Sequence, residues 1–364
     1  MIRLSRTSAH AIALGAAGLL LAACSSGGTG LTPSGTNAAP GTAGLPPALA
    51  ARLASSEGLP TAGLSNHKRS WMSPLAKRVH PLLYSSDALT NEVYVYAVNG
   101  KNDTPLGELT GFDEPYGMCA DKSGNVYITN MQGNDILEYA HGGTTAIKTL
   151  SDSYGNPGGC SVNPKTGDLA VTNFLGGGSG YGSLVIYSGG SGSGTLINIG
   201  TYQVVYAPVY DSKGNLFFET MNDSNQQATV YELPNGGSSV VPLALPSGIT
   251  IHSPSGVTWD GKDVGITDEE YESGNDEGVY RLAVSGSSAK LVGQASYSDD
   301  CYYTFSIVVQ PIVYKDRFIG GNFYCYYANN FRLDYWNYKT GGSPIRYING
   351  AQSLDTSYGQ AISK

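Results

Sequence analysis

The feature that most constrains the fold of this chain is a motif that recurs along its length. Each copy contains a tight turn that starts on Asp or Asn and includes Gly, and strand-forming residues follow it. The turns begin at Asp121, Asn163, Asp211 and Asp260, so the period is 42 to 49 residues. Gly in each turn supplies the positive φ that a tight hairpin demands. No long segment has an apolar period of 3.6 residues, so we expect few helices.

The copies share one order of elements: strand, tight turn, strand, longer loop, strand, Gly-rich turn and strand. A fifth copy, within residues 305–335, is looser. The second strands of the first four copies are GNVYITN (124–130), GDLAVTN (167–173), GNLFFET (214–220) and GKDVGITD (261–268). Four strands per unit at this period are typical of a β-propeller blade, whereas solenoid repeats of 20–30 residues do not fit.

The two ends of the repeat region complement each other. Residues 82–87 and 91–96 are similar to the second and third strands of a blade whose first strand is missing, and residues 358–363 are similar to a first strand alone. Together they make one shared blade, which protects the sheet edges of an open ring. With five internal copies, residues 82–364 are predicted to form an all-β, six-bladed propeller of four-stranded blades, at roughly 47 residues a blade.

This pattern resembles the NHL-type six-bladed propellers, a group that includes virginiamycin B lyase and the gluconolactonase-like proteins. Residues 124–130 together with NDILEY (134–139) carry the likeness best. The resemblance implies a site on the face shared by the loops that enter first strands and the loops between second and third strands. It also implies a histidine base in a lyase, or a divalent metal held by one Glu, two Asn and one Asp in a lactonase.

The N-terminus has the features of an export signal. Arg3 and Arg6 precede an apolar run, residues 11–23, that is too short to span a bilayer. The run ends in LAAC, with the cysteine at Cys24, and resembles the lipobox of bacterial lipoproteins. The resemblance implies removal of residues 1–23, lipidation of Cys24 and a place in the cell envelope. Ser25 after the cysteine favours the outer membrane in a cell that has two membranes. The alternative is an ordinary signal peptide with an incidental cysteine.

Two segments separate this signal from the propeller. Residues 24–66 hold the lipidated cysteine and a Gly-, Ser-, Thr-, Pro- and Ala-rich stretch, which cannot bury enough apolar surface to offset its ordering entropy. We interpret it as a flexible tether. Residues 67–81, which contain Trp71 and Met72, are interpreted as a lead-in that packs on the outside of the domain. The membrane is therefore expected as a partner only through the lipid.

Four cysteines follow Cys24, and four cysteines permit three pairings. An exported protein meets an oxidising compartment, so disulfides are allowed. We expect Cys301–Cys325, because a loop before a blade can reach that blade's strands. We also expect Cys119–Cys160, because both residues lie on innermost strands of neighbouring repeats. Free buried thiols are the alternative.

Aromatic residues are the most distinctive candidates for binding. Tyrosine joins an apolar ring to a polar tip, so several of them on one face could stack against sugars or peptides. The alternative is that these rings pack blade against blade. The residues expected on the binding face are Tyr116, Tyr154, Tyr206, His252, Tyr302, Tyr303 and Tyr358.

Polar residues that end second strands are the candidates for a metal site. Asn130, Asn173 and Asp268 occupy equivalent positions and could hold Ca²⁺ or another divalent metal, although no cofactor is required by the sequence. Glu219 lies one residue away from the equivalent position. The alternative is that these side chains close turns by bonding to backbone. The acidic run 268–277 could also bind calcium, or be a solvated loop.

These features favour binding over catalysis. The formal net charge of −8 disfavours nucleic acid as a partner, and His252 is the only histidine expected near the channel. We therefore expect a displayed binding or scaffold protein, monomeric, whose ligand is a glycan, a peptide or a protein. The alternative is a metal-dependent lyase or lactonase-type enzyme with its site at the channel mouth.

Overall fold

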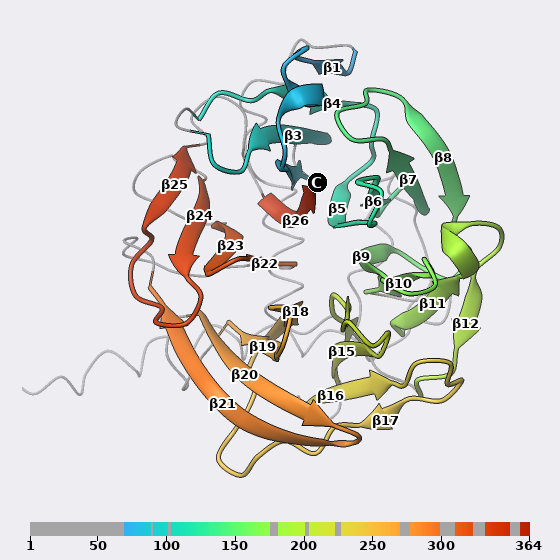
Figure 1. Ribbon diagram of the computed structural model, residues 1–364. Coiled ribbons are helices and arrows are strands. Elements are labelled where there is room, and N and C mark those ends of the chain that lie inside the picture. The colour runs from blue at the N-terminus through green and yellow to red at the C-terminus, as the bar shows by residue number, and fades with distance from the viewer. Residues whose placement is uncertain are drawn as a thin grey trace, which may run out of the picture. The chain divides into compact units, whose positions relative to one another are not determined.

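A computed structural model describes residues 69–364 except 89, 101–102, 175–180, 201–203, 223–226, 270–276, 299–309, 323–331 and 350–356. The described residues form six antiparallel sheets that follow one another around a ring (Figure 1). The prediction of a six-bladed, all-β propeller is therefore confirmed. Only two short 3₁₀ helices are present among these residues, η1 (Ala76–Arg78) and η2 (Ser188–Gly190).

Each blade is a meander whose first strand is innermost, and the strand bounds follow the repeat. Blade 1 contains β26 (Ser357–Ser363), β2 (Leu82–Asp87), β3 (Glu92–Ala97) and β4 (Gly107–Leu109); blade 2, β5 (Pro115–Ala120), β6 (Val126–Asn130), β7 (Asp135–Tyr139) and β8 (Ala146–Ser151); blade 3, β9 (Pro157–Val162), β10 (Leu169–Asn173), β11 (Ser183–Tyr187) and β12 (Thr195–Ile197). Blade 4 contains the split inner strand β13 (Val204–Val205) and β14 (Val209–Tyr210), then β15 (Leu216–Met221), β16 (Ala228–Leu233) and β17 (Val241–Pro242); blade 5, β18 (Pro254–Trp259), β19 (Val264–Asp268), β20 (Glu277–Ser285) and β21 (Ser288–Tyr297); blade 6, β22 (Ile312–Tyr314), β23 (Arg317–Asn322), β24 (Arg332–Asn337) and β25 (Arg346–Asn349).

The ring is closed by the C-terminal strand, as the two ends of the repeat predicted. β26 pairs antiparallel with β2, with Leu82 opposite Ser363 and Tyr84 opposite Ala361. Every residue of β26 is buried. The innermost strand of blade 1 therefore comes from the opposite end of the chain from its three neighbours, and its end lies near the middle of the ring (Figure 1).

The lead-in residues lie against blade 1. β1 (Trp71–Met72) pairs with β4 and adds a fifth, outermost strand. Ala76 is fully buried in an apolar cluster with Tyr84 and Tyr139. The ring of His80 stacks on that of His141, with centroids 4.3 Å apart. Among the described residues, no helix is long and apolar enough to cross a membrane.

The Asp and Gly residues of the repeat form the turn between first and second strands. Asp121 Oδ1 accepts hydrogen bonds from the main-chain N–H groups of Ser123 and Asn125, both at 2.8 Å. Asp211 repeats this arrangement one blade further on, with Lys213 and Asn215. Gly124 has φ of 85°, in the left-handed region that glycine tolerates best. The sequence signature is thus a turn held by its own side chain.

The innermost strands approach one another closely at one level of the channel. A Cβ on Gly359 would lie 2.7 Å from Gly117 Cα, and one on Gly159 would lie 2.7 Å from Ala207 Cα. Parallel bridges join Ala207 to Gly256 and Gln310 to Gly359. Gln310 therefore stands in blade 6 where the other blades have the small residues Gly359, Gly117, Gly159, Ala207 and Gly256.

Candidate functional site

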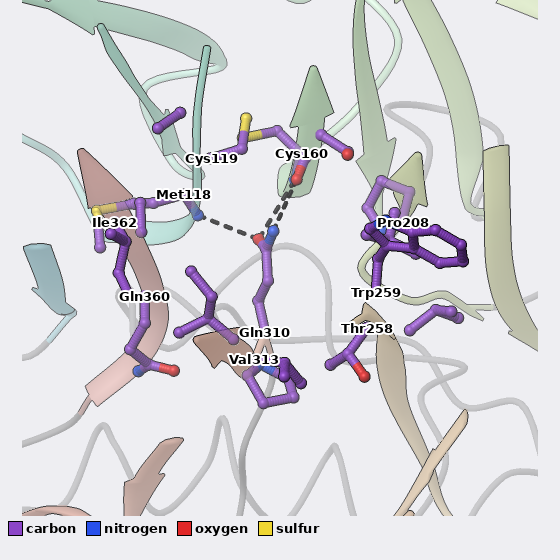
Figure 2. A pocket seen from close by; sticks show the side chains of 17 residues that line it. Met118, Cys119, Cys160, Pro208, Thr258, Trp259, Gln310, Val313, Gln360 and Ile362 are labelled. Carbon is purple, nitrogen blue, oxygen red and sulfur yellow. Dashed lines mark hydrogen bonds between the residues drawn. A yellow bond between two sulfur atoms is a disulfide. The ribbon is translucent and has the colours of Figure 1, made fainter. Parts of the chain in front are cut away.

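The centre of the ring is crossed by the side chain of Gln310. Its Nε2 donates to the main-chain oxygen of Cys160 at 2.7 Å, and its Oε1 accepts from the main-chain N–H groups of Met118 at 3.1 Å and Cys160 at 3.3 Å. Figure 2 shows this amide reaching Met118 and Cys160 from the far side of the channel. Because the other blades have Gly or Ala at this level, only blade 6 has a side chain long enough to bridge the channel there.

A cavity of about 170 Å³ lies next to Gln310. Its lining comes from the halves of the inner strands nearest the Asp/Gly turns, and includes Ala120, Val209, Trp259, Val313 and Ile362. The cavity therefore lies on the turn side of Gln310, not on the side where the sequence predicted the site. Gln360 also lines it; its Nε2 donates to Ser357 Oγ at 2.8 Å, and its Oε1 is buried without a hydrogen-bond partner among the described residues.

On the other side of Gln310, aromatic rings from blades 1 to 4 pack against one another. Tyr116 stacks on Tyr358 with centroids 4.3 Å apart, and meets Phe174 edge-on at 5.0 Å. Tyr206 joins the same cluster through Phe174, at 6.2 Å. Tyr116, Tyr206 and Tyr358 are only 5 to 8 % exposed. The structure thus brings three residues of the predicted binding face together, but it buries their rings against one another.

The other residues of the predicted binding face do not join this cluster. Tyr154 packs between blades 2 and 3, and its hydroxyl donates to the main-chain oxygen of Gly194 at 3.3 Å. His252 places its Nδ1 3.4 Å from Asp268 Oδ2 and keeps about a third of its side chain exposed. Tyr302 and Tyr303 lie outside the described residues.

The three residues predicted to bind metal are each tied within their own blade. Asn130 accepts from the main-chain N–H of Asp113 at 2.6 Å and donates to Asp135 at 2.8 Å. Asn173 donates to Ser183 Oγ at 3.0 Å. Asp268 accepts from the main-chain N–H groups of His252 and Ser253, the latter at 2.8 Å.

The bonds of Asn130 and Asp268 to main-chain N–H groups fit the alternative role of closing turns. Asn173 instead donates to the side chains of Ser183 and Asp152, and its Oδ1 is buried without a partner among the described residues. Within the part of the chain that the structure describes, no three His, Cys, Asp or Glu residues are grouped so as to hold a metal ion. A set of one Glu, two Asn and one Asp contains only two residues of these types, so the metal site that the resemblance implied stays a prediction. Residues 270–276 of the acidic run lie outside the described residues.

Glu219 is a site residue whose environment the sequence did not reveal. Its carboxylate is completely buried between blades 4 and 5, and Oε2 accepts from the main-chain N–H of Gly256 at 2.9 Å. Its Oε1 has no partner among the described residues. Burial raises the pKa of Glu219 well above its ordinary value, and the nearby charge of Asp268 raises it further.

The position of Glu219 in its blade distinguishes it from the other repeats. Ser86, Thr129, Thr172 and Thr267 stand one residue before the last polar residue of their second strands, and their hydroxyl groups bond to main-chain oxygens of inner strands. Glu219 has a carboxylate at this position, and it accepts from the main-chain N–H of Gly256 instead of donating to a main-chain oxygen. When the second strands are aligned at their ends, this position holds a hydroxyl residue in four blades and an acid in blade 4, and that difference is the sequence signal for Glu219.

One disulfide is present among the described residues, between Cys119 and Cys160. It joins the inner strands of blades 2 and 3, with Cα atoms 5.6 Å apart, and this is the pairing expected for these two cysteines. Cys301 and Cys325 lie outside the described residues. The disulfide and Gln310 therefore meet at the same residue, Cys160.

Comparisons with known proteins show the fold. No protein-family model and no curated protein match the chain. A chain from a nidogen–laminin complex is similar with a TM-score of 0.55 and 13 % identity, covering 78 % of this chain and 98 % of that chain. A protein of unknown function from Bacteroides caccae gives 0.53 and 12 %, covering 78 % and 99 %. A gluconolactonase from Xanthomonas campestris gives 0.47 and 10 %, covering 67 % and 78 %.

Proposed function

We propose that this protein is a lipid-anchored binding protein of the cell envelope, whose propeller engages a glycan, a peptide or another protein and catalyses no reaction. The observation that carries this proposal is that the polar residues predicted to bind metal already make hydrogen bonds to other groups of the protein. Asn130, Asn173 and Asp268 are each held by hydrogen bonds within their own blade, and the tyrosines beside them are packed together. Such side chains hold the ring in shape and leave its outer surfaces for binding.

The anchor in this proposal is the lipid on Cys24. The lipobox supports it, and the Gly- and Ser-rich tether would let the ring stand clear of the membrane. The test is to fractionate cells that express the wild type or Cys24→Ser. We expect the wild type in the membrane fraction and the variant in the soluble fraction. Equal distribution of the two would contradict lipidation.

Binding is tested with the full chain carrying Cys24→Ser, which removes the proposed lipidation site. This protein is applied to glycan and peptide arrays, and Tyr302→Ala/Tyr303→Ala serves as the variant that probes the remaining predicted aromatic pair. We expect saturable binding to one ligand class and no turnover of it. Light scattering coupled to gel filtration checks the expectation of a monomer.

The alternative, a lactonase- or lyase-type enzyme, is favoured by one observation, the buried acid Glu219. A carboxyl group with a raised pKa is a common feature of general acids. Metal analysis of protein purified without chelator, together with hydrolysis assays on aldonolactones, separates the two functions. Stoichiometric metal with turnover that Glu219→Gln abolishes would overturn the proposal of a non-catalytic protein.

A further inference from the structure

The charged side chains of the propeller are distributed unevenly between its two faces. We call turn face the side on which first strands turn into second strands and third strands into fourth; it is the same side in every blade, because parallel bridges join neighbouring inner strands. Every blade presents one exposed lysine there, just beyond the end of its first strand: Lys122, Lys165, Lys213, Lys262, Lys315 and Lys364. Because the first strands surround the middle of the ring (Figure 1), these ammonium groups are spaced around the channel.

The lead-in adds cations and an apolar side chain to the turn face. Its 3₁₀ helix η1 lies against the turn between the third and fourth strands of blade 2, where a Cβ on Gly142 would be 3.4 Å from the carbonyl carbon of Ala76. Lys77 and Arg78 of this helix are exposed, and Leu75 before it is 59 % exposed. An exposed apolar side chain beside basic residues is typical of segments that lie at a membrane surface.

Most carboxylates of the turn face are withdrawn into the turns. The Asp residues that begin the turns of blades 2, 4 and 5 accept hydrogen bonds from main-chain N–H groups of the same turns. Besides the terminal carboxylate, the exposed acids in the described turns are Asp103 and Asp316. Asp316 lies 3.4 Å from Lys339, and Asp103 lies 4.0 Å from Arg346, so cations outside the lysine ring partly neutralise both. Within the ring, Lys262 lies 3.8 Å from the carboxylate of the next residue.

The opposite face has the reverse composition. The described loops there, with the strand ends that they join, hold nine Asp and Glu residues: Asp87, Glu92, Asp113, Glu114, Asp135, Asp152, Asp268, Glu269 and Glu277. Two cations accompany them, Arg69 before β1 and Arg332 at the start of β24. None of the described lysines lies on this face. The chain is acidic as a whole, with a net charge of −8, but its charges are separated across the ring.

We propose that the turn face docks on an anionic phospholipid membrane. The lysines come from different blades, so a compact anion would meet one or two of them, whereas a flat anionic surface meets the whole ring at once. Each Lys or Arg close to such a surface adds to the attraction, and lysine binds phosphate as a point charge. Leu75 enters the interface beside Lys77 and Arg78. The acidic opposite face is repelled by the same lipids and is therefore turned away from them.

This inference goes beyond the proposed function and takes from it only the nearness of a membrane. The lipid proposed on Cys24 would keep the propeller close to a bilayer, which raises the local concentration of the turn face at that surface. A weak contact is then sufficient to orient the ring. The opposite face is left accessible to a partner that approaches from outside the membrane.

The test separates this surface from the lipid anchor and from the signal. It uses residues 24–364 carrying Cys24→Ser, so that neither a lipid nor the apolar run takes part. The protein is sedimented with vesicles of phosphatidylcholine alone or of phosphatidylcholine mixed with phosphatidylglycerol. We expect at least tenfold stronger binding to the mixed vesicles, and weaker binding to them as salt is raised.

The variants locate the contact on one face. Lys165→Glu and Lys213→Glu each reverse one exposed charge of the turn face, and we expect each to weaken binding to the mixed vesicles at least fivefold. Leu75→Ser should weaken it as well. Arg69→Glu is the matched control, because it reverses one exposed charge on the opposite face, and it should bind as the starting protein does. Unchanged thermal unfolding shows that the variants are folded.

Equal binding to both kinds of vesicle would overturn the inference, and so would lysine variants that bind as well as the control. Competition by soluble heparin as strong as that by phosphatidylglycerol vesicles of the same total charge would show a general polyanion site instead of a membrane-docking face. These outcomes leave the array results and the fractionation of Cys24→Ser cells unchanged. Failure of the docking face is therefore distinguishable from failure of the proposed function.

Discussion

Gln310 and Cys160 are bonded to each other across the channel, although 150 residues separate them in the chain. The Gln310 amide satisfies both main-chain groups of Cys160, and its oxygen also accepts from Met118. Blade 6 is thereby connected to blades 2 and 3 without any sheet pairing between them. The same cysteine is joined to Cys119 by the disulfide, so the inner strands are tied at one level.

Replacing Gln310 by alanine should weaken this connection. The change leaves three buried main-chain groups without their partner, and buried polar groups that lose a partner each cost about 1–3 kcal/mol unless water reaches them. We expect the free energy of unfolding to fall by about 2–3 kcal/mol in chemical denaturation. Gln294→Ala, in which an exposed amide of β21 is removed, is the control. Equal stability of the two variants would show that Gln310 does not brace the ring.

The disulfide should stabilise the folded protein, because the loop that it closes restricts the unfolded chain. Cys119 and Cys160 are 41 residues apart, and the chain-entropy estimate for such a loop is about 4 kcal/mol. We expect Cys119→Ala/Cys160→Ala to lower the free energy of unfolding by about 3 kcal/mol, since measured values often fall below the estimate. Denaturation without reductant measures this. Peptide mapping without reduction also shows whether Cys301 and Cys325 are linked. A double variant as stable as the wild type would contradict the first expectation.

Glu219 should make stability depend on pH in a defined direction. Its folded pKa lies above the ordinary value of 4.5, so the unfolded chain gives up the proton first as pH rises. The contribution of the protonated carboxyl to the free energy of unfolding is complete below pH 4.5, and it is lost as the pH rises through the folded pKa. Glu219→Gln cannot ionise, so we expect it to match the wild type at pH 4 and to exceed its stability at pH 8.

Unfolding midpoints measured between pH 4 and pH 8 provide the test for Glu219. Asp316→Asn is the control, because the Asp316 carboxylate is 76 % exposed. A constant difference between Glu219→Gln and the wild type across this range would show that the buried group does not titrate on unfolding.

The stacked histidines should make the docking of the lead-in sensitive to acid. Burial lowers the pKa of His141 below 6.5, and the charge of His80 lowers it further. The unfolded chain therefore takes up a proton before the folded protein does, and stability falls as pH drops through 6.5. His80→Gln should show a shallower fall. Thermal unfolding at pH 7.5 and pH 5.5 measures the difference, and an unchanged slope in the variant would rule out coupling between the two rings.

The fold was predictable because its determinants are local. Asp121 and Asp211 bond to the main chain of their own turns, so the same letters recur wherever the chain reverses in the same way. The count of blades follows from that recurrence and from the complementary ends. The looser fifth copy hid Gln310, whose equivalence to Gly359 and Ala207 becomes visible only through the bridges between inner strands.

The candidate site was less predictable because it depends on distances across the ring. The sequence placed Tyr116, Tyr206 and Tyr358 on one face, but it could not show that the inner strands converge so closely that the rings touch. Glu219 illustrates the second difficulty. Neighbouring residues of a strand point to opposite faces, so a shift of one position took its carboxylate into the space between blades. Contacts between blades have the same character: the hydrogen bond from Arg346 to Val98 joins residues that are 248 positions apart in the chain.

The closure of blade 1 has a consequence for the order in which the protein can mature. Strands β2, β3 and β4 of that blade are synthesised before the other blades, and its innermost strand β26 is synthesised last. The sheet of blade 1 is therefore complete only when residues 357–363 have been made. An N-terminal fragment that stops before this strand leaves β2 with an unpaired edge beside the channel. An unfinished chain therefore differs from a finished one by a single exposed strand edge.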